Sequence, residues 1–152
     1  MLSFKKILAP IDLSEASPKL VPYILAMAAK FDAEIHLLFV ARISSYLTGF
    51  YVPSPSIYEF EKSVFEGAQR RLYEFYDEYF KDWTRTHASV VQGDISETIL
   101  DYIDENDIDL LIMGTHGRKG LDRVAFGSVA DRVIKASSIP VFVVNPYRKK
   151  AA

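Results

Sequence analysis

The residues that point most clearly to a chemical function are glycines, because four of the chain's seven fall between positions 114 and 127. These four are Gly114, Gly117, Gly120 and Gly127. They lie between an apolar run that ends at Met113 and a predicted helix that begins near Ser128. Glycine lets a ligand approach the backbone closely, and backbone N–H groups beside a helix N-terminus form an anion site. The segment therefore predicts a phosphate-binding loop, with a plain surface loop as the alternative.

The spacing of these glycines differs from both common phosphate motifs. A Walker loop ends in Gly-Lys and a hydroxyl residue, and no stretch of the chain has that pattern. A dinucleotide fingerprint places its glycines directly after the first strand, whereas here that turn reads Pro-Ile-Asp-Leu-Ser. Asp12 in this turn could accept a ribose hydroxyl or ligate a metal ion near the phosphates. It could instead cap the following helix, although Ser14 could also take that role.

Other polar side chains offer weaker signals. Arg118 and Lys119 could neutralise phosphate, or they could simply be solvated charges of a loop. His116 could titrate near neutral pH, but with no identifiable acidic partner we expect it to pack or to cap. No three-ligand metal spacing links His36 and His87, which lie on or beside predicted strands, so we expect both to be structural.

Two kinds of apolar segment alternate along the chain and must position these residues. Short aliphatic runs predict five strands, at residues 7–11, 35–40, 90–91, 108–113 and 139–144. Longer stretches with helical spacing lie between them, so the chain predicts βαβ units and a doubly wound parallel sheet. Ligands of such sheets bind beyond the carboxyl ends of strands, which directs attention to the residues after Ile11, Val40 and Met113.

The longest helical stretch is rich in aromatic residues. One ladder with a spacing of seven is expected to face the core, and it consists of Tyr58, Phe65, Leu72 and Tyr79. Further aromatic side chains could form a partner patch, and these are Tyr73, Phe80 and Trp83. Capping-box patterns predict two helix starts, at Ser56 with Glu59 and at Asp94 with Glu97.

Composition excludes several classes of function. The 152 residues include no cysteine, which excludes disulfides, thiolate metal sites and cysteine nucleophiles. The net charge of −2 argues against general nucleic-acid binding, which usually requires a basic excess. The apolar-rich run at residues 20–29 is too short to span a membrane, and no secretory signal is visible. We therefore expect a cytoplasmic protein with one domain at residues 1–147 and a short basic tail at 148–152.

The glycine spacing resembles that of the universal stress protein family. The pattern is glycine, two residues, glycine, nine residues and then Gly-Ser, formed by Gly114, Gly117, Gly127 and Ser128. The resemblance covers essentially the whole chain, and the motif is that of the ATP-binding branch. It implies a five-stranded parallel sheet in the order 3-2-1-4-5 with helices on both faces. It also implies a homodimer formed through the last strand, residues 139–145.

The resemblance further implies which residues surround ATP, and we expect Mg²⁺ to accompany the nucleotide. They are Pro10, Ile11, Asp12, Val40, Met113, Gly114, Gly117, Arg118, Lys119, Gly120, Gly127, Ser128 and Val129. Those after the first two strands would meet adenine and ribose, the end of the fourth strand would support the ribose, and the rest would hold the phosphates. Asp12 would also ligate the metal ion. Ala130 departs from relatives that carry a hydroxyl residue there, which would weaken contact with the terminal phosphate.

Together these observations predict an ATP-binding regulatory dimer of the stress response. Bound phosphates would order the loop at 114–128, and a partner protein could sense that order. A slow ATPase is one alternative, for which Asp12 and Arg118 are candidates, although no dedicated base stands out. An interaction scaffold without bound nucleotide is the other.

Overall fold

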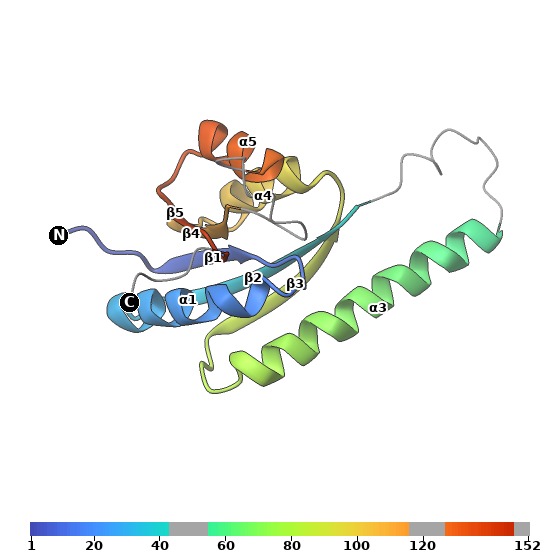
Figure 1. Ribbon diagram of the computed structural model, residues 1–152, viewed down its shortest axis with the longest axis horizontal. Coiled ribbons are helices and arrows are strands. Elements are labelled where there is room, and N and C mark those ends of the chain that lie inside the picture. Colours follow the sequence, from blue (N-terminus) through green and yellow to red (C-terminus); the bar gives the residue numbers. More distant parts are fainter. Residues whose placement is uncertain (43–54, 116–126, 148–152) are drawn as a thin grey trace.

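The computed structural model describes residues 1–42, 55–115 and 127–147 (Figure 1). Five strands form one parallel sheet: β1 (Lys6–Pro10), β2 (Glu34–Ala41), β3 (Thr86–Gln92), β4 (Leu110–Gly114) and β5 (Val141–Val144). Their order, β3-β2-β1-β4-β5, confirms the predicted arrangement. The strand order reverses at β1, whose neighbours are β2 and β4.

Helices cover both faces of the sheet, which confirms the doubly wound α/β class (Figure 1). The described helices are α1 (Ser17–Phe31), α3 (Pro55–Tyr79), α4 (Ile95–Glu105) and α5 (Ser128–Ala136). Helices α1 and α3 lie on one face, and α4 and α5 lie on the other. None of these helices is long and apolar enough to cross a membrane.

Two apolar cores, one on each face, explain why the central strands read as nearly continuous apolar runs. Alternate residues of β2 point to opposite faces. Ile35 and Leu37 pack in the core under α1 and α3, and both are fully buried. Leu38 and Val40 pack in the core under α4 and α5 and are also buried. Both faces of β2 are therefore held away from water.

The two predicted capping boxes have different outcomes. Asp94 is the N-cap of α4, and its Oδ1 accepts a hydrogen bond from the backbone N–H of Glu97 at 3.0 Å, as the sequence predicts. The prediction at Ser56 is wrong, because α3 already begins at Pro55 and Ser56 lies within its first turn. Proline is well tolerated at a first helical position, where its missing N–H breaks no helical hydrogen bond.

The aromatic ladder of α3 reaches the core only in the second half of the helix. Leu72 is 1% exposed, whereas Tyr58 is 71% exposed, so the expectation that Tyr58 faces the core is wrong. The reason is visible in Figure 1, where the first half of α3 extends beyond the sheet. Helical periodicity identifies the face of a helix, but not where the supporting sheet ends.

Most of the possible aromatic patch at the end of α3 is buried or partly buried. Phe80 is fully buried, which excludes it from a surface patch. The indole N–H of Trp83 donates a hydrogen bond to the carbonyl of Ala33 at 3.0 Å, and the side chain is partly buried. Tyr73 is exposed.

Candidate functional site

A cavity of about 780 Å³ lies at the carboxyl ends of β1, β2 and β4. This volume is in the range of pockets that hold small molecules and cofactors. Nine residues of the predicted nucleotide site line it: Pro10, Ile11, Asp12, Val40, Met113, Gly114, Gly127, Ser128 and Val129. The other four, Gly117, Arg118, Lys119 and Gly120, lie outside the described residues, as does His116.

The turn after β1 holds Asp12 at the cavity wall. Its Oδ1 accepts hydrogen bonds from the backbone N–H of Ser14 at 2.9 Å and from the hydroxyl of Ser17 at 2.8 Å. Between these residues Leu13 has a φ of 59°, which is unfavourable for a branched side chain and typical of functional turns. The N-cap of α1 is Ala16, so Asp12 secures the start of the helix without being its cap. A structural role and a ligand-binding role are therefore compatible in this carboxylate.

The start of α5 forms the opposite wall of the cavity. Gly127 is its N-cap, and no side chain of the described residues caps the helix. The Gly127 N–H donates to the carbonyl of Thr115 at 2.7 Å, and the Thr115 N–H donates to the carbonyl of Val144 at 2.8 Å. These bonds fix the helix start against the ends of β4 and β5. Helix N-termini carry partial positive charge and attract anions, and the carboxylate of Asp131 in this first turn is paired with Lys135 at 3.0 Å.

Comparison with known proteins agrees with this geometry. Residues 3–145 match the universal stress protein family. The chain belongs to that family.

Individual universal stress proteins align over nearly all of the chain. Universal stress protein MJ0531 of Methanocaldococcus jannaschii is 28% identical over 148 residues, which cover 97% of this chain and 85% of the relative. Universal stress protein MJ0577 of the same organism is 30% identical over 154 residues, covering 93% and 95%. A solved structure of MJ0577 has a TM-score of 0.79 at 27% identity, covering 99% of this chain and all of that one. A universal stress protein solved in complex with cAMP shares the fold, with a TM-score of 0.62 at 19% identity and coverage of 95% and 99%.

In this universal stress protein, α3 supplies cavity residues that sequence reasoning missed. Gly67, Ala68 and Arg71 lie on one face of the helix and line the cavity. A Cβ atom at Gly67 would meet nothing within 4 Å. The Arg71 guanidinium donates a hydrogen bond to the carbonyl of Leu13 at 3.0 Å, which ties α3 to the turn after β1. The signal in the sequence is the pair of small residues one turn before an arginine.

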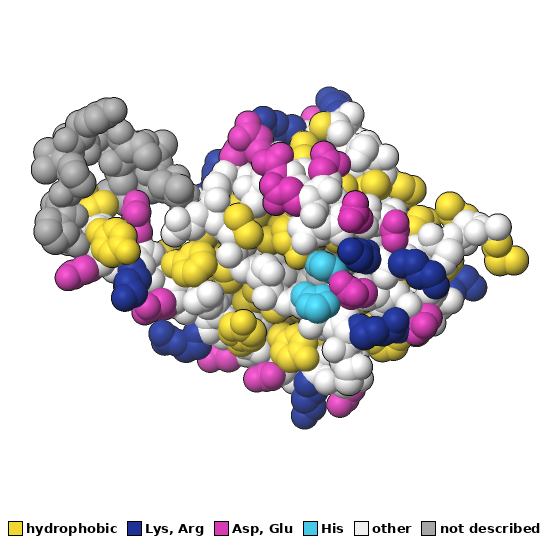
Figure 2. Space-filling model, turned by 180° about the vertical axis from the view of Figure 1, so that it is seen from behind, with side chains coloured by type: hydrophobic (Ala, Val, Ile, Leu, Met, Phe, Trp, Pro, Cys, Tyr) yellow, Lys and Arg dark blue, Asp and Glu magenta, His cyan; other side chains and the backbone are white. Residues whose placement is uncertain are grey.

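The universal stress protein fold also brings Glu34, His36 and His87 together, at the opposite end of the sheet from the cavity. The Oε1 atom of Glu34 lies 2.7 Å from Nε2 of His36 and 3.2 Å from Nε2 of His87. Burial lowers the pKa of His36, although the hydrogen bond and charge of Glu34 act to raise it. Figure 2 shows the histidine pair on the molecular surface. The sequence predicted no such cluster, because only the register of β2 against β3 makes the two histidines neighbours.

Proposed function

We propose that this protein binds ATP in the cavity and acts as a nucleotide-dependent regulatory dimer of the stress response. The observation that carries the proposal is the convergence of motif residues from β1, β2, β4 and α5 on one cavity. The family relative solved with cAMP supports a nucleotide as the class of ligand.

The chemistry of the cavity suits the parts of ATP. Buried side chains of Ile11, Val40 and Met113 provide apolar surface for a flat adenine ring. Apolar walls alone do not distinguish bases, so backbone groups at the ends of β1 and β2 are assigned to the polar edge of adenine. Gly114 allows close approach of the ribose to the end of β4.

The phosphates are assigned to the start of α5, where Gly127, Ser128 and Val129 line the cavity. Backbone N–H groups of a first helical turn bind phosphate oxygens well. Gly117, Arg118, Lys119 and Gly120 are proposed to complete the phosphate site on the grounds of the family motif.

Asp12 is proposed to bind Mg²⁺ that accompanies the phosphates. The described hydrogen bonds to its carboxylate use Oδ1, so Oδ2 is the oxygen assigned to the ion. Carboxylate oxygen is a preferred ligand of Mg²⁺, which is usually held by one or two carboxylates and substrate phosphates.

Binding is favoured over hydrolysis as the activity. Among the cavity-lining residues that the structure describes, Asp12 carries the only carboxylate, and that carboxylate is also engaged in the turn after β1. Phosphoryl transfer to water needs a group that positions the water as well as charge around the phosphate. We therefore propose that the protein senses ATP without hydrolysing it and is located in the cytoplasm, which contains the ATP that it binds.

Dimerisation is proposed through the last strand, residues 139–145. Strand β5 is at the edge of the sheet, and its Phe142 side chain is 36% exposed. An open apolar edge is prone to aggregation unless it is covered. Pairing with the same strand of a second copy about a two-fold axis covers it in both subunits.

The ATP site is tested by a change of charge at Ser128, an exposed residue at the first position of α5. Ser128→Glu is compatible with the helix, because an acidic residue in the first turn is favourable. The same carboxylate repels polyphosphate, so isothermal titration calorimetry with Mg²⁺-ATP should show at least tenfold weaker binding. Ser128→Gln is the matched neutral control and should lose about threefold or less.

Two results would contradict the proposal. One is wild-type protein that does not bind ATP, and the other is equal affinity in the Glu and Gln variants while both remain folded. Phosphate release measured in the same samples separates binding from turnover.

A further inference from the structure

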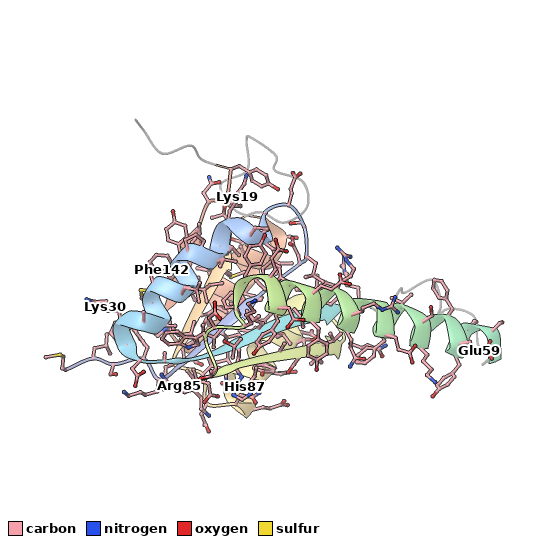
Figure 3. All side chains as sticks on the ribbon, turned by 90° about the horizontal axis from the view of Figure 1, so that it is seen from below. Lys19, Lys30, Glu59, Arg85, His87 and Phe142 are labelled. Carbon is pink, nitrogen blue, oxygen red and sulfur yellow. The ribbon has the colours of Figure 1, made fainter. Side chains whose placement is uncertain are left out.

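The amino end of the sheet carries three possible metal ligands on one face. His36 of β2 and His87 of β3 are directly paired in the parallel register, with ring centroids 5.0 Å apart. Glu34 precedes His36 by two residues and therefore points to the same face of β2. Figure 3 labels His87 close to Arg85 at the start of β3, far from the tip of α3 that bears Glu59. The cluster lies near the starts of β2 and β3, whereas the cavity lies at the carboxyl ends of β1, β2 and β4, so the two are separate.

The distances among the three side chains suit a common ion. The donor atoms of Glu34, His36 and His87 all lie within 4.8 Å of one another. Donors around a tetrahedral zinc ion, at bond lengths of about 2.0–2.1 Å, are separated by roughly 3.4 Å. The two pairs that share Oε1 of Glu34, at 2.7 and 3.2 Å, are already close to that separation. The separations of the three atoms are therefore of the size found in one coordination sphere.

We propose that Glu34, His36 and His87 form a binding site for a divalent transition-metal ion of the zinc type. Two imidazoles and one carboxylate are ligands of Zn²⁺ and its neighbours in the first transition row, whereas Mg²⁺ and Ca²⁺ prefer oxygen alone. The side chain of His87 is 57% exposed and that of Glu34 is 30% exposed, so the ion can enter from solvent. The fourth coordination position is left for water or for an external ligand.

Tyr102 on α4 provides the support that metal-binding histidines usually have. The Tyr102 hydroxyl lies 2.8 Å from Nδ1 of His36, while Nε2 of His36 faces Glu34. A ligating histidine typically donates its second ring N–H to a polar neighbour, which fixes the tautomer and the ring orientation. In the metal-bound state Nδ1–H of His36 therefore donates to the Tyr102 oxygen, and Nε2 presents its lone pair to the ion.

The basic side chain of Lys6 acts against the ion but is hydrogen-bonded elsewhere. Lys6 is close enough to lower the pKa of His36, and the same positive charge opposes a bound cation. Its ammonium donates a hydrogen bond to the carbonyl of Asn106 at 3.0 Å. Glu34 supplies the compensating negative charge in direct contact with both histidines.

A bound ion would join the edge strand β3 to β2 by side-chain ligands in addition to the backbone ladder. A ligand that binds only the folded state raises its stability in proportion to the logarithm of ligand concentration over Kd. Zinc should therefore raise the melting temperature of the protein.

The experiment uses the tag-free 152-residue chain without nucleotide. It is titrated with Zn²⁺ and followed by calorimetry and thermal unfolding. We expect one ion per chain and a higher melting temperature. His87→Gln removes one exposed ligand and should weaken binding at least tenfold, with the metal-free melting temperature unchanged. His116→Gln is the matched control, because it also removes one of the chain's three histidines, and it should bind Zn²⁺ like wild type.

Two further measurements identify the donors. Tyr102→Phe should weaken Zn²⁺ binding by about 10–100-fold, as loss of an outer hydrogen bond to a ligand does. Co²⁺ should bind with visible absorption bands of a four-coordinate site, and excess Mg²⁺ should not displace it. The proposal is overturned if wild type takes up no Zn²⁺, if His87→Gln binds as tightly as wild type, or if His116→Gln weakens binding equally.

Discussion

Asp12 has a structural role in the turn after β1 and a proposed role in Mg²⁺ binding, and substitution can separate the two. Its Oδ1 accepts hydrogen bonds within the turn after β1, and its charge is proposed to hold Mg²⁺. Asp12→Asn retains an oxygen acceptor at the Oδ1 position but removes the charge. Asp12→Ala removes both. The pair therefore distinguishes a structural carboxylate from a metal-binding one.

The structure sets the expected loss of stability in Asp12→Ala. Ser17 is 2% exposed, so its hydroxyl would lose an acceptor in a place that water reaches poorly. An unsatisfied buried donor costs about 1–3 kcal/mol, whereas the partly buried N–H of Ser14 is more easily hydrated. We expect the free energy of unfolding to fall by about 2 kcal/mol. For a chain of this size that lowers the melting temperature by roughly 4–8 °C.

Asp12→Asn should behave differently in both assays. Its melting temperature without nucleotide should lie within about 3 °C of wild type, because the turn keeps its acceptor. In calorimetry, wild type should bind ATP more tightly with Mg²⁺ than with EDTA, and the variant should lose most of that gain. With EDTA the variant should bind ATP at least as well as wild type, since one negative charge near the phosphates is gone.

The reasoning is refuted by either of two observations. A full Mg²⁺-dependent gain in Asp12→Asn would remove Asp12 from the metal site. A wild-type melting temperature in Asp12→Ala would show that the turn does not depend on the carboxylate.

Three further predictions concern selectivity, assembly and backbone geometry. ATP should outcompete GTP, because the backbone groups assigned to adenine match its polar edge; equal affinity in a competition titration would contradict this. Val143→Glu would place two carboxylates near the proposed two-fold axis, so sedimentation should show loss of a wild-type dimer; an unaltered dimer would move the interface elsewhere. Gly93→Ala should destabilise the protein by about 1–3 kcal/mol in chemical denaturation, since Gly93 has a φ of 154° and a Cβ atom would lie 2.7 Å from Oγ1 of Thr98. Gly67→Ala is its control and should stabilise the protein by up to about 1 kcal/mol, because Gly67 is helical and a Cβ atom there meets nothing; a loss of stability would be contrary to this account.

The central strands could be predicted from the sequence because both of their faces are buried. The apolar run at 35–40 lies within β2, and the run at 108–113 overlaps β4. The edge strand β3 was predicted only at 90–91 although it spans Thr86–Gln92. Its residues are only partly buried or exposed, so polar side chains interrupt the apolar pattern.

The cavity residues at the ends of strands could be predicted from the sequence, because they follow a rule about local position in the fold. Asp12, Val40 and Met113 follow or end strands, and the rule that ligands bind at the carboxyl ends of parallel strands placed them together. Arg71 was missed because its contribution depends on how α3 packs over the sheet.

The pairing of His36 with His87 was missed for a related reason. Strand register depends on long-range packing that no local motif encodes. A glutamate two residues before a histidine on a strand indicates a shared face, but it does not reveal the second strand's contribution.

Strand β2 connects the two proposed sites, because it begins at the histidine cluster and ends at the cavity. Its eight residues span about 23 Å between the first and last Cα atoms. That separation is more than twice the Debye length of roughly 8 Å at physiological salt, so charges at the two ends of the strand barely interact with each other through solvent. Two elements connect the sites: the strand itself, which β1 and β3 hold in register on both sides, and α4, which bears Tyr102 at one site and Ile99 at the other. Thermodynamic reciprocity requires each ligand to alter the other's affinity by the same factor, and a strand clamped in this way keeps that factor near one. Metal and nucleotide would then bind independently, although one rigid strand contacts both sites.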